Sequence, residues 1–406
     1  MAKTVIVVGA GLAGLRACER LRGAGFDGRL LVIGEEAHPP YNRPPLTKQF
    51  LRGSVPAEKL AFPQRDVTAD VEWWLDTRAV SVDLAGHRVR LGDGAVMSYD
   101  GLVVATGVRS RTLGLDIDPA RRHAIRTIGD AQRLAGELTM GARVVIVGAG
   151  FIGSEVAATA VSLGCDVTVV EPRSTPLEVP LGPILGAEVR RRHESHGVRF
   201  ALGHTVQTVK AAGGKPELVL SNGDRLVADV VVEAVGSVGN VEPLDGQGLD
   251  LSNGVLCDRL LHPLRDGVTV ADVVVTGDVT RFPIAGFGED PMRVEHWTMP
   301  TDMAPHAAAS LLAGMNGEQA PTEPFAPLPT FWSELYGVRL QTFGVPHLGL
   351  GDVRVLEGDL QDEAAVGYHR DGQLMGVVLI GVSRRMPEYR SAVVTAQRSR
   401  ILELAR

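Results

Sequence analysis

The chain has 406 residues, of which 45% are hydrophobic and 22% charged, with a formal net charge of -7 at pH 7. This length accommodates two or three domains, each with its own core, and the acidic balance argues against a general nucleic-acid binder. No apolar run approaches the roughly 20 residues that span a bilayer, and a strand is predicted almost directly after Met1, which leaves no room for a secretory signal. We therefore expect a cytoplasmic protein without a membrane partner.

Three cysteines, Cys18, Cys165 and Cys257, stand far apart in the sequence. They form neither a C-x-x-C motif nor a metal-ligand spacing, so we predict buried thiols and no metal site. A flavoprotein that passes electrons through an active-site dithiol needs two neighbouring cysteines. The sequence therefore excludes a dithiol relay.

The first predicted strand runs directly into a glycine-rich turn, with the sequence TVIVVGAGLAG over residues 4–14. Four consecutive β-branched residues are typical of a central parallel strand that is covered on both faces. Gly9, Gly11 and Gly14 then follow with the spacing G-x-G-x-x-G. The first glycine permits a tight turn, the second lets a pyrophosphate approach the backbone, and the third lets the next helix pack closely.

The residues around this motif favour a dinucleotide site over a simple packing turn. A helix is predicted over residues 12–22, and its N-terminus offers free amides to phosphates. An apolar strand over residues 30–33 follows and leads to two acids, Glu35 and Glu36. Strand, turn, helix, strand and acid form the context that the motif requires.

The stretch YNRPPLTK, residues 41–48, predicts a short helix. Asn42 can cap it, and proline is tolerated in a first turn because the amides there are unpaired anyway. Such a rigid turn fixes Arg43 and Lys48 relative to each other. Both are candidate site residues.

A β-meander is predicted over residues 79–100, with turns at 85–86 and 93–94. The next strand, residues 102–104, ends on a turn of small residues formed by Ala105, Thr106 and Gly107. A turn of this kind allows a ligand to approach the backbone closely. Arg109 follows directly.

Residues 143–155, RVVIVGAGFIGSE, repeat the first motif, with glycines at Gly148, Gly150 and Gly153. A helix through residue 161 and a strand over residues 166–170 follow, and Glu171 stands at the strand's end. Chance would rarely reproduce this whole arrangement twice. The sequence therefore predicts two nucleotide sites, one in each of two domains.

The rest of the chain predicts further strands and a third domain. Between the units lies a polar helical linker, residues 121–141. A hairpin is expected over residues 218–226 and buried strands over 229–235 and 270–275, followed by a proline-rich boundary at 317–329 and tail strands at 337–344, 364–368 and 374–380, with helix after Pro387. Mixed α+β structure suits this tail.

Taken together, GAGLAG, YNRPPLTK, ATG, GAGFIGSE, VVEAVG and TGD resemble one family over essentially the whole chain. They are similar to the FAD-dependent NADH:ferredoxin reductases of bacterial oxygenase systems. The resemblance implies an α/β fold of two Rossmann-like, glutathione-reductase-like domains and a C-terminal α+β domain. It implies an FAD domain at 1–112 and 236–316, an NADH domain at 113–235 and a C-terminal domain at 317–406.

The resemblance also implies that FAD takes a hydride from NADH and passes electrons singly to an iron–sulfur ferredoxin, of the two-iron two-sulfur type, that supplies a monooxygenase or dioxygenase. It assigns FAD contacts to Gly9, Gly11, Gly14, Glu35, Arg43, Lys48, Ala105, Thr106, Gly107, Arg109, Asp278, Glu295, His296, Trp297 and Trp332. Glu35 would hold the adenosine ribose, with Glu36 a solvated turn acid. Lys48 would lie at the reactive edge of the flavin and favour its anionic reduced form.

For NADH, the resemblance assigns the pyrophosphate to Gly148, Gly150 and Gly153 and the nicotinamide side to Gly236. Glu155 would face Lys48 across the flavin edge, and these two are the candidate catalytic residues. Glu171 can accept from both ribose hydroxyls of NADH, whereas a 2′-phosphate would meet like charge. Arg173 nearby leaves some tolerance for NADPH.

Several alternatives stay open at this stage. Outside this motif Lys48 would be interpreted as a surface lysine. Glu155 has the alternative of a first-turn helix acid, and Trp332 that of a core aromatic residue. After Trp297 the chain reads TMPTDMA where the family usually has amide side chains. An NADH oxidase that uses oxygen directly, or a flavin-bound protein of the apoptosis-inducing-factor type, remains an alternative function.

Overall fold

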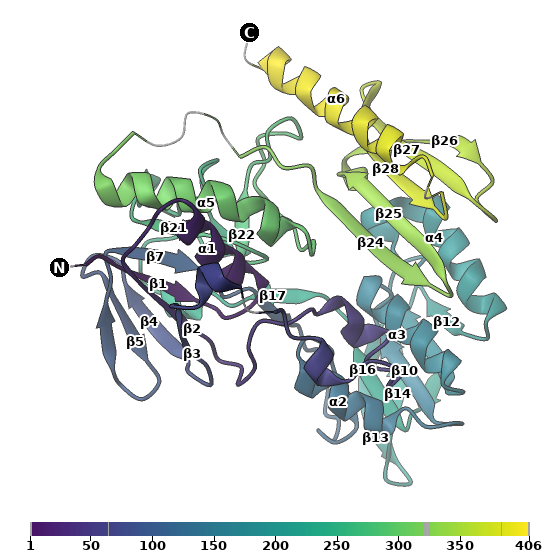
Figure 1. Ribbon diagram of the computed structural model, residues 1–406. Helices are drawn as coiled ribbons and strands as arrows, with labels where there is room; N and C mark the ends of the chain where they lie inside the picture. Colours follow the sequence, from purple (N-terminus) through teal and green to yellow (C-terminus); the bar gives the residue numbers. More distant parts are fainter. Residues whose placement is uncertain (1, 64, 320–322, 324, 383, 405–406) are drawn as a thin grey trace.

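The computed structural model describes residues 2–63, 65–319, 323, 325–382 and 384–404 (Figure 1). Three five-stranded sheets organise these residues. Two are parallel and carry the two glycine motifs, and the third is antiparallel and lies in the C-terminal part of the chain. The predicted fold class is confirmed.

The first sheet has the strand order β21-β7-β1-β2-β3. Its strands are β1 (Thr4–Val8), β2 (Arg29–Ile33), β3 (Glu72–Trp74), β7 (Gly101–Val104) and β21 (Val273–Val275). The apolar residues of its three central strands, β7, β1 and β2, are buried, as a parallel sheet that is covered on both faces requires. Helices α1 (Leu12–Gly23) and α5 (Met299–Asn316) lie side by side against it (Figure 1).

Residues from two distant parts of the chain therefore build one sheet. β21 pairs with β7 in parallel, with Val274 opposite Val103. The predicted meander forms beside it from β4 (Ala79–Asp83), β5 (Arg88–Leu91) and β6 (Val96–Ser98).

The second parallel sheet has the order β12-β11-β10-β16-β9. Its strands are β9 (Arg122–His123), β10 (Arg143–Val147), β11 (Asp166–Glu171), β12 (Arg199–Leu202) and β16 (Val230–Glu233). Its helices are α2 (Ile128–Glu137), α3 (Phe151–Ser162) and α4 (Glu178–Ser195), the last kinked where Gly182 adopts φ 78°. The predicted hairpin forms between β14 (Lys215–Leu220) and β15 (Arg225–Val227), and β13 (Val206–Ala212) completes that small sheet.

Short strands link these parts. β8 (Val108–Ser110) and β17 (Ser237–Gly239) pair where the chain crosses between the two parallel sheets. The other short strands are β18 (Val255–Leu256), β19 (Leu264–Arg265), β20 (Val268–Thr269), β22 (Thr280–Phe282) and β23 (Met292–Arg293).

The C-terminal sheet has the order β24-β25-β28-β27-β26 and is followed by α6 (Met386–Leu404). Its strands are β24 (Thr330–Leu335), β25 (Val338–Gly344), β26 (Asp352–Gly358), β27 (Ala364–Arg370) and β28 (Gln373–Ile380). The three predicted tail strands are confirmed. The two edge strands β24 and β26 were not expected. On β26 the consecutive residues Val355 and Leu356 are both exposed, which breaks the alternation typical of a half-buried strand.

The predicted Asn42 cap is wrong. The short 3-10 helix spans Pro44–Thr47 and begins after Arg43, without a side-chain cap. The two prolines at its first positions have no amide hydrogen, so a capping side chain would find little to accept from. The proline-rich boundary lies partly outside the described residues.

Among the helices that the structure describes, none combines the length and the apolar character that crossing a bilayer requires.

Candidate functional site

A single cavity of about 1270 Å³ extends from the first glycine turn to the C-terminal sheet. Most of the predicted site residues lie on its wall: Gly9, Gly11, Glu35, Arg43, Lys48, Ala105, Thr106, Gly107, Arg109, Gly150, Glu155, Gly236, Asp278, Glu295, His296, Trp297 and Trp332. Four do not line it: Gly14, Gly148, Gly153 and Glu171. The structure thus brings most of the predicted site residues together around one cavity and leaves these four outside its wall.

The three glycines of the first motif have three different surroundings. Gly9 adopts φ 122°, and a Cβ there would lie 2.1 Å from the carbonyl oxygen of Ala105. A Cβ at Gly14 would lie 2.0 Å from the carbonyl oxygen of Gly9, whereas one at Gly11 would meet nothing within 4 Å. Gly9 and Gly14 therefore allow backbone to pack on backbone, and Gly11 leaves open space on the cavity wall.

The second motif repeats this division closely. A Cβ at Gly148 would lie 2.4 Å from the carbonyl oxygen of Ala234, and one at Gly153 would lie 2.0 Å from that of Gly148. Only Gly150 is open, with nothing within 4 Å, and it alone of the three lines the cavity. Each parallel sheet therefore presents one unobstructed glycine at the start of a helix.

Glu171 ends β11 and faces its own glycine loop. Its carboxylate accepts from the backbone amide of Ala149 at 2.8 Å and from that of Arg173 at 3.0 Å. Two backbone donors fix the carboxylate beside the second motif, outside the main cavity.

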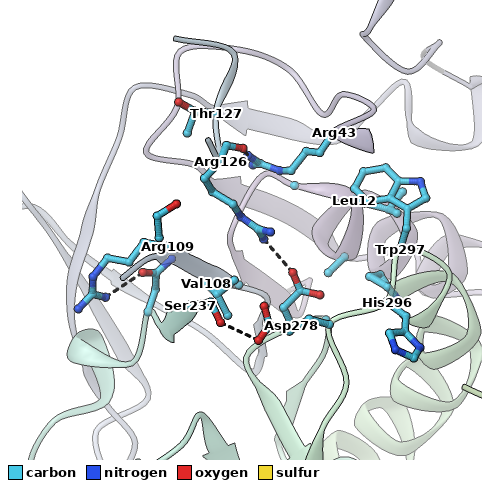
Figure 2. Close-up of a pocket in the computed structure, with 18 of the residues that line it drawn as sticks. Leu12, Arg43, Val108, Arg109, Arg126, Thr127, Ser237, Asp278, His296 and Trp297 are labelled. Atoms are coloured by element: carbon cyan, nitrogen blue, oxygen red, sulfur yellow. Dashed lines mark hydrogen bonds and ion pairs between the residues drawn. The ribbon is translucent and has the colours of Figure 1, made fainter. Parts of the chain in front are cut away.

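Arg126 was missed by the sequence analysis, which placed it in a polar linker. Its guanidinium donates to the Asp278 carboxylate at 2.8 Å across the cavity (Figure 2). Burial lowers the pKa of Arg126, but the charges of Asp278 and Glu295 outweigh that effect and raise the pKa overall. A signal was present in the sequence: Thr127 begins a capping box with Asp130, which fixes the start of α2 directly after Arg126.

Arg43 lies on the same wall and pairs with Glu36 at 2.5 Å. It also donates to the carbonyl oxygen of Arg126 at 2.6 Å, and Tyr41 donates to Glu36 at 2.6 Å. The expectation that Glu36 is a solvated turn acid is therefore wrong, because the RPP turn brings a cation back onto it. Glu35 keeps its side chain 70% exposed, with Arg78 at 3.7 Å.

Arg109, on β8, contacts the segment that follows β17. It pairs with Glu242 at 2.6 Å and donates to the side-chain oxygen of Asn240 at 2.9 Å. Half of its side chain stays exposed. Its present contacts are thus structural, at the rim of the cavity.

Lys48 and Glu155 form the ion pair at the centre of the site. Their charged atoms lie 2.5 Å apart, with 13% and 7% of the side chains exposed. Thr47 donates a further hydrogen bond to the same carboxylate oxygen at 2.6 Å. The alternatives of a surface lysine and an ordinary helix acid are both wrong, since a buried pair on a cavity wall is neither.

The wall toward the C-terminal sheet is mostly uncharged and aromatic. Burial lowers the pKa of His296 to about 4, even though the nearby Asp278 charge opposes this, so the ring is neutral at pH 7. Trp297 stacks on Phe62 with ring centroids 6.3 Å apart. Trp332 lines the cavity and carries Arg339 over its ring at 5.5 Å.

Glu295 follows β23 and lies on the cavity wall. It accepts from Ser237 at 2.6 Å, and Figure 2 marks this contact by the dashed line at Ser237. It also pairs with Arg293 at 2.8 Å. These contacts link β17 to β23 at the cavity wall.

The donor set of the cavity fits a dinucleotide. The hydroxyl of Thr106 is buried on the wall and has no hydrogen-bond partner within the described residues. The open glycine Gly11 stands at the N-terminus of α1, where backbone amides and the helix dipole favour phosphate. Arg126 and Arg43 line the same cavity, each paired with a carboxylate, Asp278 and Glu36 respectively.

Comparison with known proteins decides the family. Residues 3–304 match the pyridine nucleotide-disulphide oxidoreductase model, and residues 330–405 match the reductase C-terminal model. The chain is 34% identical to the anthranilate 1,2-dioxygenase system ferredoxin–NAD(+) reductase component of Burkholderia cepacia, over 93% of this chain and 91% of that protein. The chain belongs to the ferredoxin–NAD(+) reductase family.

Two further comparisons agree. The biphenyl dioxygenase system ferredoxin–NAD(+) reductase component of Paraburkholderia xenovorans is 31% identical, over 95% of this chain and 91% of that protein. The crystal structure of the covalent putidaredoxin reductase–putidaredoxin complex matches with a TM-score of 0.87 and 27% identity, covering 98% of this chain and 93% of that one. Membership of the ferredoxin–NAD(+) reductase family makes this protein an FAD-dependent oxidoreductase that uses NAD(H).

Proposed function

We propose that this ferredoxin–NAD(+) reductase oxidises NADH and delivers electrons singly to an iron–sulfur ferredoxin, of the two-iron two-sulfur type, that supplies a monooxygenase or dioxygenase. When bound, FAD accepts the hydride of NADH and releases the electrons one at a time. The observation that carries the proposal is the buried Lys48–Glu155 pair on a cavity that both glycine loops border.

The chain's own residues hold and orient the two cofactors in this proposal. Gly11 and the amides of α1 take the FAD pyrophosphate, with Arg126 and Arg43 as cationic partners. The Asp278 carboxylate accepts from hydroxyl groups of FAD, and the Thr106 hydroxyl forms a hydrogen bond with polar groups of FAD. Glu35 binds the adenosine ribose. The neutral, aromatic wall of Trp297, His296 and Trp332 excludes water from the flavin end.

The second parallel sheet binds NADH. Gly150 leaves room for its pyrophosphate, and Gly236 borders the nicotinamide side. Glu171 accepts from the adenosine ribose hydroxyls and disfavours a 2′-phosphate by charge. Gly148 and Gly153 act indirectly, by letting α3 approach β10.

The same reasoning supports three domains. The FAD domain combines residues 1–112 and 236–316, because β21 joins the first sheet. Residues 113–235 form the NADH domain and 317–406 the C-terminal domain. We place the protein in the cytoplasm, where reduced thiols such as Cys18, Cys165 and Cys257 persist.

A thiol-dependent NADH oxidase is disfavoured by the cysteines. All three are buried, and none lies on the cavity wall in the described part of the chain. Burial raises the pKa of Cys18 to about 12, which keeps its thiol protonated.

The test measures three rates on the purified holoprotein: flavin reduction by NADH, reduction of an added two-iron two-sulfur ferredoxin, and oxygen consumption without the ferredoxin. We expect fast ferredoxin reduction and slow oxygen consumption. Oxygen consumption as fast as flavin reduction would indicate an oxidase. NADH binding that changes self-association, without turnover, would indicate a signalling protein of the apoptosis-inducing-factor type.

A further inference from the structure

Ser333, on the edge strand β24, donates a hydrogen bond to the Glu155 carboxylate. Its hydroxyl donates to Oε1 of Glu155 at 2.7 Å, whereas Lys48 and Thr47 both contact Oε2. Ser333 is 1% exposed and Glu155 is 6% exposed. Both carboxylate oxygens are therefore held inside the protein, each by a different element.

These contacts join three parts of the fold. Lys48 follows the 3-10 turn, which lies in sequence between β2 and β3 of the first sheet and packs against α2 and α3. Glu155 lies on α3 of the second sheet, and Ser333 belongs to the C-terminal sheet. Figure 1 shows that β24 of the C-terminal sheet runs close to α3, which covers the second parallel sheet. The residue before Ser333, Trp332, lines the cavity.

We propose that Ser333 is a positioning residue that holds Glu155, and through it Lys48, on the cavity wall. This inference rests on the proposed function, because it gives the C-terminal sheet a part in the reaction with NADH. Without the serine hydroxyl, Oε1 is left buried and unpaired, and the carboxylate turns toward other donors. The lysine then loses its fixed position beside the bound ring.

Removing the Ser333 hydroxyl tests its hydrogen bond to Glu155 and leaves the packing of β24 against α3 in place. Phe331 packs edge-on against Phe151 of α3, with ring centroids 4.5 Å apart. That apolar contact remains in a Ser333→Ala variant and keeps β24 in place. The variant also introduces no added volume.

A matched control lies on the neighbouring strand. Thr342 of β25 stands opposite Phe331 in the sheet, and its hydroxyl is buried without a partner in the described residues. Thr342→Val removes a buried hydroxyl from the same sheet and leaves Glu155 untouched. Both variants are compared with wild type as holoproteins, together with Glu155→Gln and the double variant Ser333→Ala/Glu155→Gln.

Three quantities are measured: the midpoint potential of the bound flavin, the rate of its reduction by NADH, and the melting temperature. In Ser333→Ala we expect a rate about tenfold slower and a potential shifted to more negative values, because a displaced lysine stabilises negative charge on the ring less. Thr342→Val leaves both near the wild-type values. In the Glu155→Gln background, Ser333→Ala adds less than about twofold, since it acts through the carboxylate.

A Ser333→Ala variant with wild-type potential and rate would overturn the inference, and so would an equal slowing in the Glu155→Gln background. A fall in melting temperature with unchanged potential would show a purely structural serine and would also overturn it. Wild-type flavin that NADH fails to reduce would contradict the proposed function itself, and this inference with it.

Discussion

The Glu171 carboxylate accepts a hydrogen bond from the backbone amide of Ala149 at 2.8 Å. The acid that ends β11 is thereby tied to the glycine loop that ends β10, and its position does not depend on a bound nucleotide. A fixed negative charge beside the loop is suited to accept from ribose hydroxyls and to repel a 2′-phosphate. This contact is the basis of the first prediction.

Replacing Glu171 by Gln should weaken the preference for NADH over NADPH. One unit charge at about 5 Å, with an effective dielectric near 20, corresponds to about 3 kcal/mol, so the ratio of kcat/KM values should fall about 10- to 100-fold. The glutamine oxygen can still accept from Ala149. Glu35→Gln, at the corresponding strand end of the first sheet, serves as the control and should leave the ratio unchanged. An unaltered ratio in Glu171→Gln would contradict the assignment.

Replacing Lys48 by Met should slow flavin reduction by NADH about 10- to 100-fold while FAD stays bound. The methionine keeps the apolar stem but removes the charge that pairs with Glu155. Stopped-flow absorbance measures the rate, and the visible spectrum measures the FAD content. Lys59→Met, at an exposed position, should match wild type. A wild-type rate in Lys48→Met would refute a catalytic role for this lysine.

Replacing Gly14 by Ala should severely destabilise the first sheet and reduce the FAD content. The new Cβ would lie 2.0 Å from the carbonyl oxygen of Gly9, which is backbone and cannot move alone. Overpacking of this kind costs about 1–3 kcal/mol or more. Gly23→Ala, at the end of the same helix, meets nothing within 4 Å and should be neutral or slightly stabilising. Thermal unfolding and flavin absorbance compare the two; equal stability would contradict the close approach.

His193 should make the protein less stable in acid. It is fully buried, with Nδ1 2.6 Å from the Tyr336 hydroxyl, and burial together with the charge of His196 lowers its pKa to about 4. Between that value and the ordinary value of about 6.5, the unfolded chain binds a proton that the folded chain does not. The free energy of unfolding therefore falls as pH drops through this window, by up to about 1.4 kcal/mol per pH unit.

The His193→Gln variant cannot titrate, so its melting temperature should fall less than that of wild type between pH 7 and pH 5. Above pH 8 both side chains are neutral, and the difference between the two proteins then reports the lost Tyr336 contact together with the lost packing of the imidazole ring on Phe200 and Tyr336. Parallel curves over the whole range would show that His193 does not contribute to the acid sensitivity.

Local spacing was enough to predict the two glycine motifs and their strands, because the turn, the close helix packing and the open glycine are set by neighbouring residues. The partners that complete the site are not local. Ser333 and Glu155 are 178 residues apart, and Arg126 reaches Asp278 over 152. No period or motif encodes such pairs, so only the assembled sheets reveal them. The position of the 3-10 turn was predicted correctly. The ion pair between Arg43 and Glu36 was not predicted, because it depends on the direction in which that turn orients the Arg43 side chain.

The pairing of β21 with β7 has a consequence for biogenesis. On the ribosome, the strands of the first sheet emerge early, but their edge partner at residues 273–275 follows only after the whole second sheet has been synthesised. Until then the β7 edge carries unsatisfied backbone groups, which in nascent chains invite aggregation. A chain whose translation stalled before residues 273–275 would keep the β7 edge exposed and would be prone to aggregate.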